Sequence, residues 1–383
     1  MTIFNIRKRQ ELAEINNKLL PNIERSNNII FIYTKPKVGS TSLVSSIRLF
    51  ASNKFSVLHL HDEEMLKVIC NLSPNSNITI NDIIQYNKSI GKNVYVIDVY
   101  RSPIERKISA FFEKIGAYHF NNIDSKINTY DIERVIKRFN TIFPHIANGD
   151  NFLDCYNLTN KPLKFDTNNK YLYLEENGIK YIKLRLCDSS QWSYILTKLL
   201  QTEIIIVKDY ESTNKEIKDL YIRFKNEYKI PINFINEYIQ NDTYLNYYYS
   251  EVEKQQYINE WLQNSTPNIY TPFTKEEYKL YEEITIENCH LDYIQQNHYL
   301  DEGCICNSCN TKRTKVCEQI KQNQQTLNQV CKVWHEEASV EMAKKRLEQA
   351  VKVTRALSKM PNKYVKGRKD FNGEMKSVVK MGK

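Results

Sequence analysis

The stretch from Ile29 to Phe50, IIFIYTKPKVGSTSLVSSIRLF, constrains the fold of this chain more than any other. A run of apolar and aromatic residues at 29–33 ends at a short polar loop, after which Leu43, Ile47 and Phe50 recur on one face of a helix. A buried strand, a tight loop and a helix in this order form an anion site, because the loop N–H groups and the positive end of the helix dipole converge. The stretch predicts an α/β protein that binds a phosphate or phosphosulfate group at this turn.

The loop and the first helical residues carry the groups that such a site needs. They are Lys35, Lys37, Val38, Gly39, Ser40, Thr41 and Ser42. Gly39 lets the backbone approach a ligand closely, the three hydroxyls that follow add hydrogen-bond donors, and Lys37 adds a mobile positive charge. The loop is not a Walker A motif, because that motif places its lysine after the second glycine, whereas Lys37 precedes Gly39.

Size, charge and cysteine usage narrow the class of protein. A chain of 383 residues can form one large domain with an appendage, and a formal charge of +9 favours anionic partners. Its nine cysteines are an odd number, and four of them (Cys70, Cys155, Cys187 and Cys289) are scattered, which argues against a disulfide framework. No apolar stretch approaches the roughly 18 residues of a membrane span, and the N-terminus lacks a signal-peptide core. We therefore expect a soluble cytoplasmic protein, from a bacterium or from a virus and its host.

Further strands are expected at 55–61 and 93–100, in a hairpin at 171–186 with its turn at Asn177-Gly178, and in a buried strand at 203–207. Helical patterns lie between them. Strands that alternate with helices predict a P-loop-like, doubly wound, mostly parallel sheet flanked by helices, with an antiparallel addition. The expected organisation is an N-terminal helix (1–27), this α/β domain (28–265), a helical and Cys-rich segment (266–318), and a long helix with a basic tail (319–383). The α/β core thus carries a helical, Cys-containing C-terminal appendage.

A second strand-to-helix junction begins at Arg101. Ser102 is a candidate N-cap, Pro103 occupies the first helical position, and Glu105 is placed to complete a capping box. Arg101 therefore lies at the carboxyl end of a strand, which is where open α/β sheets bind their ligands. Ser109 lies two turns along the predicted helix.

The two junctions together resemble the sulfotransferases that use 3′-phosphoadenosine-5′-phosphosulfate (PAPS) as donor. The first motif of that family, P-K-x-[GA]-[ST]-[TS]-[SW], is similar to PKVGSTS here, and the second, R-[DS]-P-x-x-R-x-x-S, is similar to RSPIERKIS. The likeness is greatest to the carbohydrate (heparan 2-O-type) branch and to bacterial proteins of capsular polysaccharide synthesis. It spans about residues 28–262, including LRLCDSSQW and YYYSEVEKQQYINEW, but lacks the R-K-G-x-x-G segment of cytosolic-type members, so the adenine-side contacts are unassigned.

The resemblance implies a role for each motif. Lys37 would donate to the bridging oxygen of the donor, and Ser40–Ser42 would hold its 5′-phosphate. Arg101 and Ser109 would bind the 3′-phosphate, and Arg106 has the right charge to help. The acceptor would be a hydroxyl, most simply of a carbohydrate or polysaccharide.

The acceptor hydroxyl needs a general base, and histidine is the usual choice near neutral pH. Relatives of the 2-O type carry an H-x-H pair between the two motifs, which His59 and His61 match. We favour His61, since it is nearer the end of the strand, with His59 second. The acidic residues at 62–64, Asp62, Glu63 and Glu64, stay as alternatives.

A cysteine cluster follows the α/β region. Cys304, Cys306, Cys309 and Cys317 are close enough in sequence for a candidate structural zinc site with four thiolates. The long helix after it has an irregular apolar stripe and offers a surface for a protein partner.

Two other functions compete with the sulfotransferase interpretation. A P-loop-type nucleotide or small-molecule kinase would share the sheet, but it predicts a GK[ST] sequence that this chain lacks. A non-catalytic nucleotide-binding interaction protein would explain the C-terminal residues 304–383. Nucleic acid is not the favoured partner, because no basic patch interleaved with aromatic residues is present.

Overall fold

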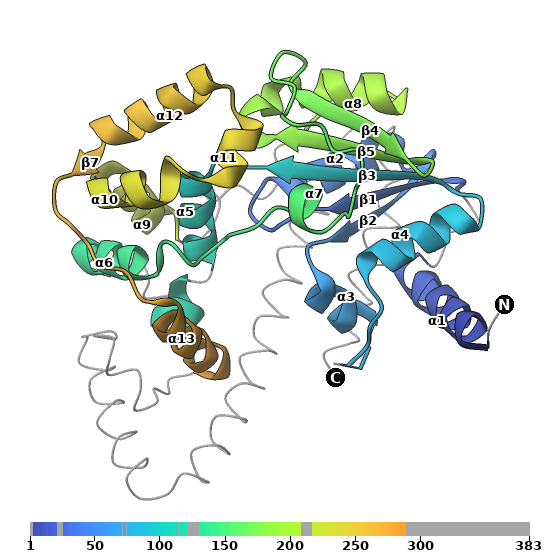
Figure 1. Ribbon diagram of the computed structural model, residues 1–383, viewed down its shortest axis with the longest axis horizontal. Coiled ribbons are helices and arrows are strands. Elements are labelled where there is room, and N and C mark those ends of the chain that lie inside the picture. Colours follow the sequence, from blue (N-terminus) through green and yellow to red (C-terminus); the bar gives the residue numbers. More distant parts are fainter. Residues whose placement is uncertain are drawn as a thin grey trace, which may run out of the picture.

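The computed structural model describes residues 3–20, 26–70, 72–73, 75–113, 115–120, 130–207 and 217–288. Its centre is a five-stranded sheet with the order β2-β1-β3-β5-β4 (Figure 1). The strands are β1 (Asn28–Tyr33), β2 (Phe55–Leu60), β3 (Asn93–Tyr100), β4 (Tyr171–Glu176) and β5 (Ile179–Arg185). All neighbouring pairs are parallel except β4 with β5, which form the predicted antiparallel hairpin. The α/β class and the mostly parallel sheet are confirmed.

Side chains of the strands alternate between two apolar layers. Ile30 and Ile32 of β1 join one buried cluster, whereas Ile29 and Phe31 join the other. Helices α2 (Ser40–Ala51) and α8 (Trp192–Leu200) cover the first face, and α1 (Ile3–Leu19), α3 (Glu63–Cys70) and α4 (Ile80–Ser89) cover the second. Figure 1 shows α8 above the sheet and α1, α3 and α4 below it. Since both faces are covered, the parallel strands are mostly apolar, and charged side chains such as Asp98 of β3 and Lys183 of β5 are buried among them.

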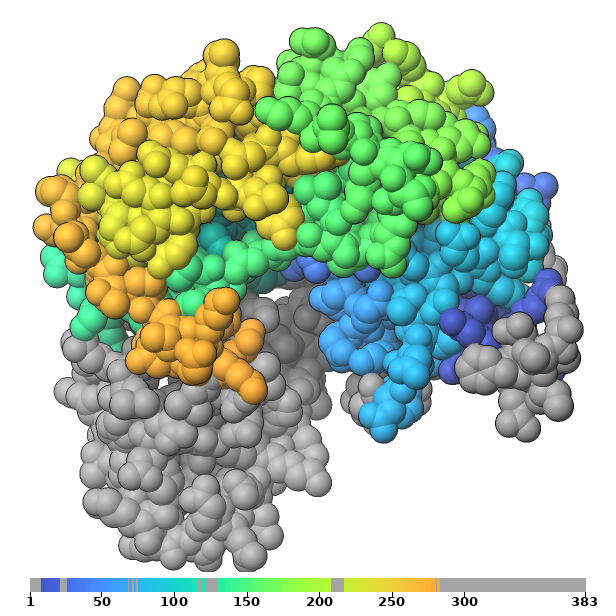
Figure 2. All heavy atoms as spheres, viewed as in Figure 1, coloured from blue at the N-terminus to red at the C-terminus, as the bar shows by residue number. Residues whose placement is uncertain are grey.

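A second group of helices lies to the left of the sheet in Figure 1. Its principal members are α5 (Pro103–Glu113), α6 (Ile132–Ile142), α9 (Lys218–Glu227), α10 (Ile232–Phe234), α11 (Thr243–Tyr248), α12 (Glu251–Gln263) and α13 (Lys275–Asn288). Shorter elements connect them: η2 (Ile115–Phe120), α7 (Asn151–Asp154), η4 (Leu186–Gln191), β6 (Ile230–Pro231), η6 (Ile235–Ile239) and β7 (Ser265–Thr266). In Figure 2 the yellow residues of this group meet the green residues around the β4–β5 hairpin along the top of the molecule.

The predicted strand at 203–207 is wrong. The backbone N–H groups of Ile204, Ile206 and Val207 donate instead to side-chain hydroxyls of Thr197, Ser193 and Ser46, at 2.9, 3.0 and 2.9 Å. Ile204 is buried while Ile205 is 45% exposed. The segment is thus an extended crossing over α8 and α2, in which helix hydroxyls replace a neighbouring strand.

The cysteine cluster and the long C-terminal helix, with the zinc and partner predictions attached to them, lie outside the described residues. Within the described ranges, no helix combines the length and the apolar character that crossing a bilayer requires.

Candidate functional site

The loop between β1 and α2 has a backbone that only certain residues can adopt. Lys37 and Gly39 have φ angles of 68° and 87°, both in the left-handed region. A Cβ atom at Gly39 would lie 2.8 Å from Cδ1 of Leu186 and 3.5 Å from the Trp192 ring. Glycine is therefore required both for its conformation and for the space. The segment LRLCDSSQW supplies the residues that pack beneath the loop.

The polar residues that follow Gly39 begin helix α2. Val38 and Ser40 are buried, Ser42 is half-buried and Thr41 is exposed. Gly39 occupies the N-cap position and no side chain caps the helix. The first N–H groups of α2 therefore keep their capacity to bind an anion.

Arg101 contacts this loop directly. Its Nη1 donates to the carbonyl oxygen of Lys37 at 2.9 Å. The contact follows from the sheet, because β1 and β3 are parallel neighbours and their carboxyl ends emerge side by side. Burial lowers the pKa of the Arg101 guanidinium, which stays charged at neutral pH. The structure thus brings together two predicted motifs that lie more than sixty residues apart.

The side chain of Lys37 forms an ion pair that sequence reasoning missed. Its Nζ lies 2.9 Å from Oε2 of Glu113, and the two side chains are 18% and 33% exposed. Glu113 is the last residue of α5 and lies four residues beyond Ser109, on the same side of the helix. That spacing is the signal that could have identified it. Ser109 itself is buried.

Lys35 and Arg106 both meet the segment at 146–149. A Cβ atom at Gly149 would lie 3.3 Å from Cε of Lys35, so this side chain passes closely over the segment. Arg106 is buried and donates from Nη1 to the carbonyl oxygen of Gly149 at 2.6 Å. Lys107 donates to the carbonyl oxygen of Ile146 at 2.7 Å. Arg106 therefore supports the wall of the site.

The two candidate base histidines lie side by side at the end of β2, with ring centroids 4.5 Å apart and rings nearly perpendicular at 79°. Nδ1 of His61 lies 2.7 Å from the carbonyl oxygen of Thr34, the first loop residue. A carbonyl only accepts, so Nδ1 carries the proton and Nε2 carries the lone pair. Burial lowers the pKa of His61 despite this bond. The ring is therefore neutral at pH 7.

His59 is enclosed more completely. Burial, helped by the adjacent His61 and by Arg48, lowers the pKa of His59 to about 3. Its Nε2 is buried and has no hydrogen-bond partner within the described part of the chain. A buried Nε2 cannot reach an acceptor hydroxyl, so the geometry favours His61 over His59 as the candidate base.

The three acidic residues after His61 have structural partners. Asp62 accepts from the N–H of Met65 at 2.8 Å, and Glu64 pairs with Lys67 at 2.8 Å on the surface. Glu63 accepts from the N–H of Ile80 at 2.9 Å, at the start of α4, and burial raises its pKa. The carboxylate of Glu63 is therefore occupied by the helix terminus.

Helix α12 braces the start of α5. The predicted capping box is wrong, because Glu105 accepts instead from Oη of Tyr257 at 2.8 Å and from Nε1 of Trp261 at 3.0 Å. Tyr249 adds a bond to Oγ of Ser102 at 3.3 Å. The helix still begins at Pro103, where the backbone of Ser102 accepts the first bond. The segment YYYSEVEKQQYINEW thus fixes the corner that carries Arg101.

A buried ionic network lies under the site. Lys183 of β5 is fully buried, and its Nζ lies 2.7 Å from Oδ2 of Asp98 and 2.5 Å from Oδ2 of Asp150. Tyr248 donates to the other oxygen of Asp150 at 2.7 Å, and the N–H of Phe152 donates to Asp98 at 2.8 Å. The network ties β3 and β5 to the segment that receives Arg106. Nothing in the sequence pattern predicted it.

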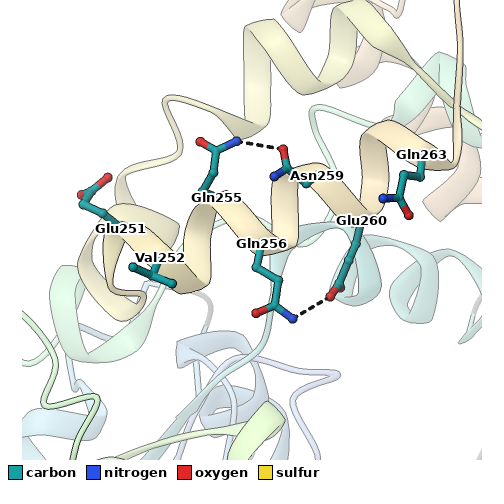
Figure 3. Close-up of a pocket in the computed structure, with 7 residues that line it drawn as sticks. All are labelled: Glu251, Val252, Gln255, Gln256, Asn259, Glu260 and Gln263. Carbon is teal, nitrogen blue, oxygen red and sulfur yellow. Dashed lines mark hydrogen bonds between the residues drawn. The ribbon is translucent and has the colours of Figure 1, made fainter.

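Two further observations concern ligands. A shallow hollow is lined by seven residues of α12 alone, where Gln255 bonds to Asn259 and Gln256 to Glu260 (Figure 3). It contains none of the predicted site residues. In the described ranges, no group of three or more His, Cys, Asp or Glu side chains is arranged to hold a metal ion.

Comparison of the chain with protein-family models, with curated proteins and with solved structures gives no significant match in any of the three.

Proposed function

We propose that this protein is a PAPS-dependent sulfotransferase with a P-loop-like core, which transfers the sulfuryl group to a hydroxyl of a carbohydrate. The observation that carries the proposal is the bond from Arg101 to the carbonyl oxygen of Lys37. It joins a loop suited to a phosphosulfate and a half-buried arginine suited to a second phosphate. A donor with two separated anionic groups would engage both motifs at once.

The donor would lie across the two junctions. Its 5′-phosphosulfate would sit over the loop and the first N–H groups of α2, where Ser40, Thr41 and Ser42 add hydroxyls. Its 3′-phosphate would pair with Arg101 and bond to Ser109. Lys37 would neutralise the charge that develops on the bridging oxygen as the sulfur–oxygen bond breaks. A group with this role is typically worth about 10²–10³ in rate.

The acceptor oxygen would attack sulfur in line with the leaving 3′,5′-adenosine diphosphate, and Nε2 of His61 would take its proton. The bond from Nδ1 of His61 to Thr34 fixes the ring and leaves Nε2 as the basic nitrogen. Thr34 belongs to the same loop as Lys37, so base and leaving-group stabiliser share one support. Positioning of this kind is the main contribution of a protein to group transfer.

The kinase alternative explains fewer of these features. A Walker lysine would follow the glycine and lie at the start of the helix, whereas Lys37 precedes Gly39. A kinase also gives no role to the half-buried Arg101 or to its contact with the loop. The interaction-protein alternative rests on residues 304–383, outside the described ranges.

Calorimetric titration with 3′,5′-adenosine diphosphate, beside ATP, tests the proposal. Arg101→Ala should weaken bisphosphate binding about 10- to 100-fold, because a hydrogen bond to a charged group is worth roughly 1.5–3 kcal/mol. The matched control is Arg223→Ala, which removes an exposed arginine from α9. Preference for ATP, the absence of nucleotide binding, or equal affinities of the two variants would each sink the proposal.

A further inference from the structure

The ion pair between Lys37 and Glu113 gives the lysine of the proposed donor site a negatively charged partner within the protein. The lysine that should meet the donor is already held by a carboxylate at 2.9 Å. A carboxylate next to a phosphosulfate is unfavourable, since two like charges a few ångströms apart repel each other. Glu113 therefore opposes the binding of the very group that Lys37 attracts.

The position of Glu113 determines what it can do. It ends α5, the helix whose start is braced by α12 through Glu105. Its side chain is more exposed than that of Lys37, so it lies on the outer side of the pair. Rotation of the partly exposed Glu113 side chain would be enough to separate the pair, whereas the backbone of Lys37 is held by the bond from Arg101.

We infer that Glu113 is a latch, a positioning residue that holds the Lys37 side chain in the unliganded protein and releases it when the donor arrives. The inference rests on the proposed function and extends it. The donor would exchange one negative partner of Lys37 for another, so the lysine would remain paired at each stage. A carboxylate paired with an ammonium is also a weak proton acceptor, which leaves the role of base to His61.

Glu113→Gln tests the latch, because glutamine keeps the shape and removes the charge. The affinity for 3′,5′-adenosine diphosphate should rise about three- to tenfold, because the partly exposed Glu113 carboxylate no longer competes with the nucleotide for Lys37. The control is Glu251→Gln, which removes an exposed carboxylate of α12. That carboxylate lies 3.5 Å from Nζ of Lys164. The affinity of this variant should equal that of the unsubstituted protein.

The same titration in a Lys37→Met background separates a latch from simple repulsion. A latch acts through Lys37, so the gain from Glu113→Gln should largely disappear there. A gain that persists in full would mean that Glu113 only repels the donor, and the latch would be refuted. Equal affinities of Glu113→Gln and the unsubstituted protein would refute it too, while leaving the donor site in place. If neither the unsubstituted protein nor any variant binds the bisphosphate, the proposed function and the latch are both refuted.

A measurement without nucleotide tests the ion pair itself. Competitive acetylation with acetic anhydride, read by mass spectrometry, reports the reactivity of each lysine against the others. Pairing keeps the Lys37 amine protonated and slow to react, so Glu113→Gln should accelerate its labelling about threefold or more. An unchanged rate would show that the pair is absent in solution and would overturn the inference.

Discussion

Among single substitutions in the sheet, replacement of the buried Lys183 by methionine should lower the free energy of unfolding the most. The substitution keeps most of the side-chain volume and removes the ammonium group. Asp98 and Asp150 would then face one another in a buried site without the cation that now lies 2.7 and 2.5 Å away. Removing one partner of a buried ion pair typically costs about 3–5 kcal/mol.

That cost is large relative to the total free energy of unfolding. Proteins of this kind are stable by about 5–15 kcal/mol, so about a fifth or more of the free energy of unfolding would be lost. The corresponding fall in melting temperature is about 6–20 °C, at roughly 2–4 °C per kcal/mol for a domain of this size. Urea unfolding followed by tryptophan fluorescence measures the first quantity, and a thermal scan measures the second.

The matched control is Lys180→Met, three residues earlier on the same strand. Lys180 is half-buried, and its Nζ donates to a neutral partner, Oη of Tyr95, at 3.2 Å. Its loss should cost less than about 1 kcal/mol. Equal destabilisation by the two substitutions would refute the reasoning, because it would mean that the buried carboxylates gain nothing from Lys183.

Two further predictions use contrasts within the chain. Gly39→Ala should abolish binding of 3′,5′-adenosine diphosphate, because the new methyl group would lie 2.8 Å from Leu186. Gly91→Ala is the control, because Gly91 has a similar φ of 84° but nothing within 4 Å of the added methyl group, so calorimetric binding should be intact. Equal losses of binding in the two variants would contradict the steric argument. His59 has its pKa lowered to about 3 in the native state, against about 6.5 when unfolded. The unfolded chain therefore binds the extra proton, and stability falls with pH below about 6.5, by about 2 kcal/mol at pH 5 from this residue alone. His59→Leu should remove that part of the loss in urea titrations at pH 7 and pH 5, and identical losses in both proteins would disprove it.

The sequence predicted those parts of the fold that local patterns control. The β-branched runs of β1 and β3 and the turn at Asn177-Gly178 gave the strands and the hairpin. Both turn residues have positive φ, as a tight hairpin turn of this type requires. The apolar run at 203–207 misled because its composition is that of a strand, whereas among the residues that the structure describes it has no neighbouring strand to pair with and only Ile204 of the run is buried. Its N–H groups bond to helix hydroxyls, which no local pattern records.

For the candidate site, too, some features could be predicted from the sequence and others could not. The loop and Arg101 were predicted together, since motifs at the carboxyl ends of parallel strands converge once those strands are neighbours. The partners of each group were not predictable. The Lys37–Glu113 pair, the contacts of Glu105 and the network around Lys183 join residues far apart in sequence, and they depend on how the helices pack. His61 was favoured over His59 from its position at the end of the strand, but its bond to Thr34 was not predictable.

The brace on Glu105 also sets the order in which the site is completed during synthesis. Tyr257 and Trp261 lie 152 and 156 residues beyond the glutamate that they hold. At a synthesis rate of about 5–20 residues per second, the loop and Arg101 leave the ribosome roughly 8–30 seconds before the residues that fix their geometry. The sheet can start to form in that interval, but the geometry around Arg101 is completed only when α12 arrives. The nascent protein therefore has its strands before it has the final geometry of its candidate site.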